Sequence, residues 1–214
     1  MKRKKKVLLI LVSIILFCIW YWWMYVLFWS NALERISYAV DDGIDGNLYW
    51  FERIKETEEC FWDEMYGGVQ ISYSDEYVKD DVGVGVYSSD KGKFTVSAGF
   101  TLEEKKDKEI NVFTGMNYDR NKHKFIFEPI FILVFEKDDT GVIGTENYHD
   151  ESTIYQYLNQ YNITEEDIRE YQNYILYDVV VKTWTKAHGG LNFLERLKIG
   201  LCIEDHTFDF EYKE

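Results

Sequence analysis

The fold is decided by residues 82–102, VGVGVYSSDKGKFTVSAGFTL, where apolar side chains alternate with small or polar ones on both sides of a turn-like segment. This period of two is typical of two β-strands. The three valines of the first strand share one face, and the alternate residues from Phe94 to Leu102 share one face of the second. A hairpin has to bring both apolar sets to the same side, because a shift of one residue would move a whole set into water.

This condition selects the length of the hairpin loop. A two-residue loop would pair odd with even positions and separate the two apolar sets. A three-residue loop, Asp90-Lys91-Gly92 with its glycine in the left-handed conformation, keeps them together. The pairs that it predicts are Val86 with Val96, Val84 with Ala98 and Gly83 with Gly99.

The second face of this hairpin is poor in side chains. Gly83, Gly85 and Gly99 lie on it, and Gly115 is expected to join them from the next strand. Glycines gathered in strands are typical of a bent sheet or of a close approach by another group. Two interpretations stand side by side: a curved sheet that offers this face to a partner, or a helix that packs closely over it. Under the first, the predicted partner-binding residues are Tyr87, Thr95, Ser97, Phe113 and Glu128.

The same periodicity extends beyond the hairpin. The predicted strands are Val69–Ser74, Val82–Ser88, Lys93–Leu102, Ile110–Tyr118, Lys124–Phe135 and Gly141–Tyr148, with a last one at Leu197–Ile203. Short connections indicate antiparallel neighbours and hence a meander. The predicted helices are Asn31–Val40, Ser152–Asn159 and Thr164–His188, the last opened by a capping box of Thr164 and Asp167. Leu48–Met65 is of mixed character.

The chain begins with five basic residues, Lys2 to Lys6, and then runs from Val7 to Ser30 without a charge. About 20 apolar residues cross a bilayer as a helix, so residues 7–29 are predicted to span a membrane. Aromatic residues near the end of this run disfavour a cleaved signal peptide, which needs small side chains there. Phe17 likewise disfavours lipidation of Cys18. The basic start predicts a cytoplasmic N-terminus and an extracellular remainder.

These elements predict an α+β protein: an N-terminal transmembrane helix, then a curved antiparallel β-meander packed with two C-terminal helices and a final strand. The expected division is a basic start and anchor over residues 1–30 and one extracellular domain over residues 31–214. That outer part carries 19 basic and 38 acidic residues, a formal net charge of −19. Such a charge disfavours nucleic acid and anionic lipid as partners and favours a basic surface or cations. A purely solubilising role for the acids is an equal alternative.

Motifs for catalysis or for a cofactor are missing from the sequence. None of the four histidines, His123, His149, His188 and His206, has metal-ligand spacing to another or a neighbouring nucleophile motif. We therefore predict a protein that is not an enzyme and has no cofactor.

Three weaker patterns leave alternatives open. Asp41–Glu52 matches a calcium loop imperfectly, with Gly43 at a ligand position. Asp205-His206 with Asp209 could be drawn as a metal cluster, but a solvated strand end is favoured. Cys60 and Cys202 could form a disulfide outside the cell, although we prefer two separate buried thiols.

The second C-terminal helix carries a family resemblance. The first part of the pattern consists of Tyr161 to Ile168, Tyr171, Tyr174 to Val180 and Trp184. The second part follows Gly189-Gly190 and consists of Phe193 and Leu197-Lys198-Ile199. This pattern resembles the TipC family of immunity proteins, most sharply over residues 158–203. The resemblance implies a membrane-anchored antidote to an LXG-type toxin exported by type VII secretion in Gram-positive bacteria. It also implies that the antidote meets the toxin outside the membrane and blocks it.

The residues themselves leave other classes of function open. The principal alternative is a membrane-anchored extracellular domain that binds a small ligand or an envelope lipid, which would require an apolar cavity. An extracellular enzyme would require convergent polar groups that the sequence does not display.

The predicted topology can be tested by labelling. With Ser89→Cys, an impermeant thiol reagent should label intact cells above the level of the parent chain, because residues 31–214 are expected outside. Labelling that appears only after lysis would contradict the outward orientation.

Overall fold

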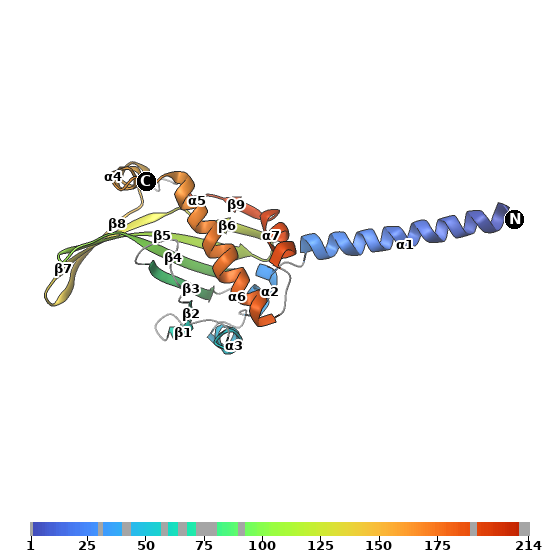
Figure 1. Cartoon of the computed structure of the whole chain (residues 1–214), viewed down its shortest axis with the longest axis horizontal. Coiled ribbons are helices and arrows are strands. Elements are labelled where there is room, and N and C mark those ends of the chain that lie inside the picture. Colours follow the sequence, from blue (N-terminus) through green and yellow to red (C-terminus); the bar gives the residue numbers. More distant parts are fainter. Residues whose placement is uncertain are drawn as a thin grey trace.

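In the computed structural model, the described residues are 2–29, 32–39, 44–56, 60–63, 68–71, 81–89, 93–188 and 192–209. Their fold is α+β, as predicted. Figure 1 shows a twisted sheet crossed on one face by a long helix, with a separate apolar helix projecting away from the domain. The core consists of side chains between the sheet and the helices.

The described residues form nine strands in one sheet. These are β1 (Cys60–Asp63), β2 (Gly68–Ile71), β3 (Asp81–Ser89), β4 (Lys93–Glu104), β5 (Lys108–Asp119), β6 (Lys124–Phe127), β7 (Phe131–Asp138), β8 (Gly141–Tyr148) and β9 (Ile203–Asp205). The order is β1-β2-β3-β4-β5-β6-β9, and β7 pairs with β5 and β8. All neighbours are antiparallel except β6 and β9, which are parallel. For the predicted strand Val69–Ser74, residues 72–74 lie outside the described ranges.

The predicted register of the central hairpin is confirmed. Val86 pairs with Val96 and Val84 with Ala98, and the two glycines, Gly83 and Gly99, are opposite each other. Val84 and Val86 of β3 and the apolar residues of β4 from Phe94 to Phe100 are buried, as the condition of a common apolar face requires. Residues 90–92, the predicted loop, lie outside the described ranges.

The single strand predicted at Lys124–Phe135 is wrong, because the segment forms two strands. β6 pairs with the last residues of β5, and β7 pairs with its first residues. Between them Pro129 has no N–H to donate to a ladder, and the N–H of Ile130 instead donates to the carbonyl of Thr207 at 3.1 Å. The predicted meander therefore ends at β6, since β7 returns to β5.

The apolar face of the sheet is covered by the predicted C-terminal helices. They are α4 (Glu151–Gln160) and a continuous rod of α5 (Glu165–Tyr174), the π-helix η1 (Ile175–Val181) and α6 (Lys182–His188). Thr164 and Asp167 form the predicted capping box at the start of α5. Figure 1 shows this rod lying diagonally across β3–β6. Tyr171 packs its ring edge-on against Phe100, with ring centroids 4.9 Å apart.

The strand predicted at Leu197–Ile203 is also wrong over most of its length. Helix α7 (Asn192–Gly200) occupies it, and only the short β9 follows. Leu197, Ile199, Leu201 and Ile203 alternate as in a strand, but Lys198 and Ile199 are buried side by side. Adjacent buried residues fit one face of a helix and not one face of a strand.

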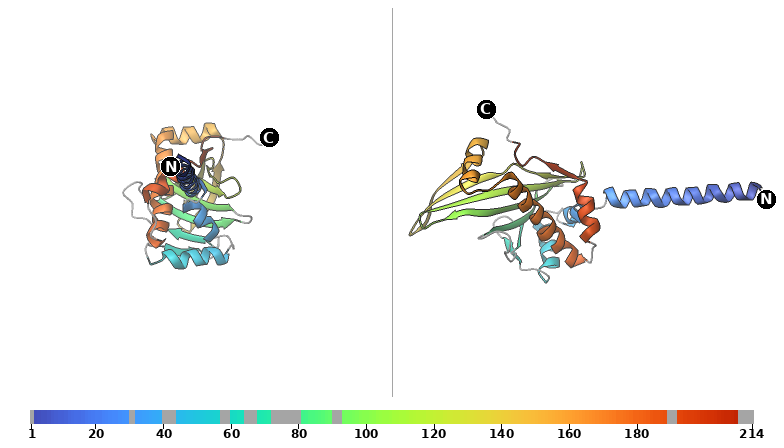
Figure 2. Two further views of the ribbon diagram at one scale, coloured as in Figure 1. Left: turned by 90° about the vertical axis from the view of Figure 1, so that its right-hand side faces the viewer. Right: turned by 45° about the horizontal axis from the view of Figure 1, so that its top comes forward.

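Three helices precede the sheet: α1 (Lys2–Trp29), α2 (Ala32–Ala39) and α3 (Ile44–Ile54). Helix α2 confirms a helix within Asn31–Val40, but it is an element separate from α1, and residues 31 and 40 lie outside the described ranges. The 19-residue segment Lys5–Trp23 of α1 is long and apolar enough to be a candidate membrane span, and none of it is buried against the domain. Figure 2 shows α1 leaving the end of the domain where α2 and α7 lie.

A chain of buried hydrogen bonds joins the rod to the sheet. The side-chain amide of Gln172 donates to the hydroxyl of Thr114 on β5 at 2.7 Å. The hydroxyl of Thr207 donates to the carbonyl oxygen of the same Gln172 at 3.0 Å. All three side chains are buried, so each would lose a partner in a solvent-free place if Gln172 were removed.

Gln172→Ala should lower the free energy of unfolding by about 1–3 kcal/mol, because two buried hydroxyls would lose a hydrogen-bond partner. The neighbouring Asn173 is exposed, and Asn173→Ala should change stability by less than about 0.5 kcal/mol. Urea unfolding of both variants measures the difference. Equal stabilities would show that the buried bonds contribute nothing.

Candidate partner-binding face

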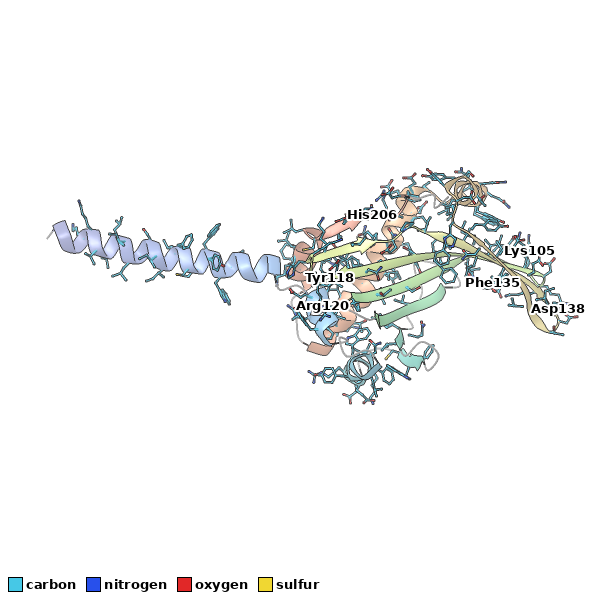
Figure 3. All side chains as sticks on the ribbon, turned by 180° about the vertical axis from the view of Figure 1, so that it is seen from behind. Lys105, Tyr118, Arg120, Phe135, Asp138 and His206 are labelled. Carbon is cyan, nitrogen blue, oxygen red and sulfur yellow. The ribbon has the colours of Figure 1, made fainter. Side chains whose placement is uncertain are left out.

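The face of the sheet opposite the helical rod carries the predicted partner-binding residues. Cross-strand pairs share a face of the sheet, and the ladders pair Thr95 with Tyr87 on β3 and Ser97 with Gly115 on β5. Phe113 on β5 is paired with Gly99. Figure 3 views this face from behind the rod, and no helix of the described residues crosses in front of β3–β5 there. We call it the open face.

Two hydrogen bonds run across the open face. The hydroxyl of Thr95 donates to the side-chain carbonyl of Asn117 at 2.6 Å. The amide of Asn117 in turn donates to the carboxylate of Glu128 at 2.6 Å. All three side chains are half-buried. The relay orients Asn117 and holds one carboxylate oxygen of Glu128, which leaves an acidic group in a fixed position on the face.

Glu128 reaches this position because of the break between β6 and β7. Its N–H donates to the carbonyl of Gly115 at 2.8 Å, which bridges the gap left on β5. A Cβ on residue 115 would lie 3.4 Å from the Cβ of Glu128. The side chain of Glu128 thus lies directly over the backbone of Gly115, where an added Cβ would make an ordinary van der Waals contact.

An aromatic row lies beside the polar relay. The rings of Phe113 and Phe131 are stacked with centroids 5.3 Å apart and planes 10° apart. The His149 ring follows at 5.3 Å from Phe131. Phe113 and Phe131 are half-buried and His149 is exposed. Stacked, partly exposed rings are rigid apolar surfaces of the kind that interfaces use as anchors.

The structure thus brings four of the predicted residues, Thr95, Ser97, Phe113 and Glu128, to one face. Tyr87 stands opposite Thr95 in the ladder, but its side chain lies outside the described part of the chain. The sequence prediction missed Asn117 and Phe131. Asn117 could have been found, since it is two residues beyond Gly115 on the same strand. Phe131 could not, because its position depends on the break at Pro129.

The comparisons with known proteins concern the whole chain. Residues 4–189 match the family described as TipC immunity protein-like. The chain belongs to this family. The solved structure of TipC2 from Streptococcus intermedius B196 is similar, with a TM-score of 0.51 and 16% sequence identity, over 75% of this chain and 87% of that one. At this identity the likeness shows a shared fold. Comparison with curated proteins finds no match.

The other clusters considered in this TipC-like chain do not assemble into sites. Asp205 forms an ion pair with Arg169, while His206 contacts Glu204 and Asp209. Ile44–Ile54 is a helix, so the second half of the segment Asp41–Glu52 cannot wrap around calcium as a loop; residues 41–43 lie outside the described ranges.

No disulfide joins Cys60 and Cys202, which lie at opposite ends of the sheet order. Both side chains are partly buried. Burial raises the pKa of the Cys202 thiol.

His206 gives a pH-dependent contribution to stability. Its Nε2 lies 2.9 Å from Glu204 and its Nδ1 lies 3.1 Å from Asp209. Both hydrogen bonds raise the pKa of His206 above its ordinary value of 6.5, and the bond with Glu204 has the larger effect. The bond from Lys124 and the one from His206 lower the pKa of Glu204 to about 2. A histidine with a raised pKa stabilises the fold below pH 6.5 and loses this effect as the pH rises through its folded pKa.

The difference in melting temperature between the parent chain and His206→Gln should therefore be widest below pH 6.5 and narrow above it. Asp209→Asn should produce a smaller change of the same sign, because Glu204 remains. A difference that stays constant from acid to alkaline pH would contradict the charge interaction.

Proposed function

We propose that the chain is a membrane-anchored immunity protein that binds a cognate secreted antibacterial toxin at the outer face of the cytoplasmic membrane. It neutralises the toxin by occlusion and not by catalysis. The observation that best supports this proposal is the open face, because a sheet covered on one side by helices leaves its other side for a partner. The LXG class of the toxin and its export by type VII secretion follow from the family resemblance of residues 158–203.

The proposed binding site is the open face with Tyr87, Thr95, Ser97, Phe113 and Glu128. Three physical features support it. The stacked Phe113 and Phe131 supply an apolar anchor, and the relay from Thr95 to Glu128 supplies oriented polar groups. The glycines between them let a partner backbone approach closely. The acidic outer part, of net charge −19, would speed encounter with a basic toxin surface.

The proposed topology uses residues 1–30 as cytoplasmic start and anchor and residues 31–214 as the extracellular domain. Its support is the candidate span Lys5–Trp23, with basic residues before it and tryptophans at its other end. Basic residues favour the cytoplasmic side, and tryptophan favours the membrane–water interface. The bilayer is then the second partner, through residues 7–29.

The binding face can be tested with the toxin encoded beside this chain's gene. Phe113→Ala should weaken toxin binding by at least about 1 kcal/mol, roughly fivefold, because truncation removes an aromatic anchor. Thr95→Arg should weaken it further, since a long charged side chain would occupy the relay position. Calorimetry on the detergent-solubilised chain measures both, and cell survival under toxin exposure gives the functional readout.

The matched control is Asn173→Arg, which adds the same side chain at an exposed position of α5 on the opposite side of the sheet. It should bind the toxin as the parent does. Melting temperatures separate lost binding from lost folding. Parent-like binding by folded Thr95→Arg and Phe113→Ala variants would move the interface away from the open face.

A further inference from the structure

Helix α7 exposes a row of large apolar side chains. Phe193 is 77% exposed, Leu197 49% and Leu201, just past the helix end, 57%. A spacing of four residues turns each side chain by about 40° from the last, so the three fall within about 80° of the helix circumference. On the other side, Lys198 and Ile199 are buried against the domain. The orientation is the reverse of an ordinary surface helix, whose apolar stripe faces the core.

This apolar stripe of Phe193, Leu197 and Leu201 lies where the domain meets α1. Figures 1 and 2 both show α7 at the end of the domain from which α1 leaves. Two residues separate Trp29, the end of α1, from Ala32, the start of α2. Three Cα steps reach at most about 11 Å, and α2 contacts α7. Whatever surrounds the end of α1 is therefore close to the stripe.

Polar and basic groups flank the stripe at the same end. Tyr38 on α2 is 60% exposed, and the Arg120 guanidinium lies 4.8 Å from the centre of its ring. Figure 3 shows Arg120 beside the α1 end of the sheet. The turn between β5 and β6, residues 120–123, holds Arg120 and Lys122. Lys122 lies 3.9 Å from Asp119 and Lys124 forms an ion pair with Glu204, so basic groups at this end are matched by acids.

An amphipathic helix with such flanks has the chemistry of a membrane surface. Interfacial helices bury their apolar face about 5–10 Å into the boundary between headgroups and acyl chains. Tyrosine suits the headgroup layer above it, and an arginine can lay its apolar stem along such a surface while its guanidinium stays in water. The aromatic residues from Trp20 to Trp29 place the same layer at the end of α1.

We infer that α7 lies on the outer leaflet of the bilayer, with Phe193, Leu197 and Leu201 inserted, and so docks the domain on the membrane in one orientation. This inference rests on the proposed anchoring by α1. The strands then run away from the bilayer, with Lys105 and Asp138 at the far end (Figure 3). The open face stands upright beside the membrane, where it is accessible to a partner.

Spin labels on the full-length chain in phospholipid vesicles test the docking. Nitroxides are placed by Phe193→Cys or Leu197→Cys, after the three native cysteines are changed to serine. Collision with oxygen, which concentrates in lipid, is compared with collision with a water-soluble nickel chelate. The oxygen-to-nickel ratio should be several-fold higher at both positions than at Ile143→Cys, an equally exposed apolar position at the far end.

A label at Leu11→Cys reports separately on the anchor. A lipid signal at Leu11 with water-exposed labels at Phe193 and Leu197 would overturn the docking of α7 and leave the anchor in place. A water signal at Leu11 would overturn the anchoring as well. If labels at Phe193 and Leu197 collide with neither oxygen nor the nickel chelate, protein, such as a second copy of the chain, covers the stripe. That result would also overturn the inference.

A second variant addresses the stripe as a unit. Phe193→Glu combined with Leu197→Glu should abolish the lipid signal of a label at Leu201→Cys, because two carboxylates cannot enter the acyl region. The matched control, Val142→Glu with Ile143→Glu at the far end, should leave that signal unchanged. Circular dichroism checks the fold of each variant. A lipid signal at Leu201 that survives the stripe variant would contradict the inference.

Discussion

The rest of the structure depends on the pairing of β3 with β4. Val84 and Val86 have to share a face with the apolar residues of β4, and the observed register, with Val84 opposite Ala98 and Val86 opposite Val96, achieves this. A slip by one residue would expose every one of these side chains. In this register the apolar side chains of both strands lie on the face that packs against the helical rod. On the opposite face, the same register places glycines beside small polar residues. One constraint therefore creates both the covered core and the open face.

A second constraint acts at the edge of β5 that does not pair with β4, because the strands on that edge, β6 and β7, are both shorter than β5. Neither β6 nor β7 spans the twelve residues of β5, Lys108–Asp119, and the break between them falls at Pro129. The carbonyl at Gly115 is still satisfied there, because the N–H of Glu128 donates to it. The break consequently places a carboxylate over a position without a side chain. The charge on the open face is thus a consequence of strand termination.

The sequence predicted the parts of the fold that local pattern determines. The register of the central hairpin, the capped start of α5 and the faces of Thr95, Ser97 and Phe113 all follow from alternation and spacing. Alternation misled at residues 197–203, because apolar residues at every second position also leave a four-residue spacing from Phe193 to Leu201. The adjacent burial of Lys198 and Ile199 on α7, with Leu197 and Leu201 exposed, decides between the two, and it depends on tertiary contacts. The contribution of Phe131 to the open face could not be predicted either, because it depends on the break between β6 and β7 at Pro129.

The buried bonds of Gln172 have a consequence for the uniqueness of the fold. Apolar contacts between a helix and a sheet tolerate sliding, since one branched side chain replaces another at little cost. Moving the rod by one turn would carry Gln172 away from Thr114 and Thr207 and leave three polar groups without partners in the interior. The bonds thus distinguish one seating of the helix from its neighbours. Their contribution is selectivity among packed arrangements, which a gain in overall stability would not by itself provide.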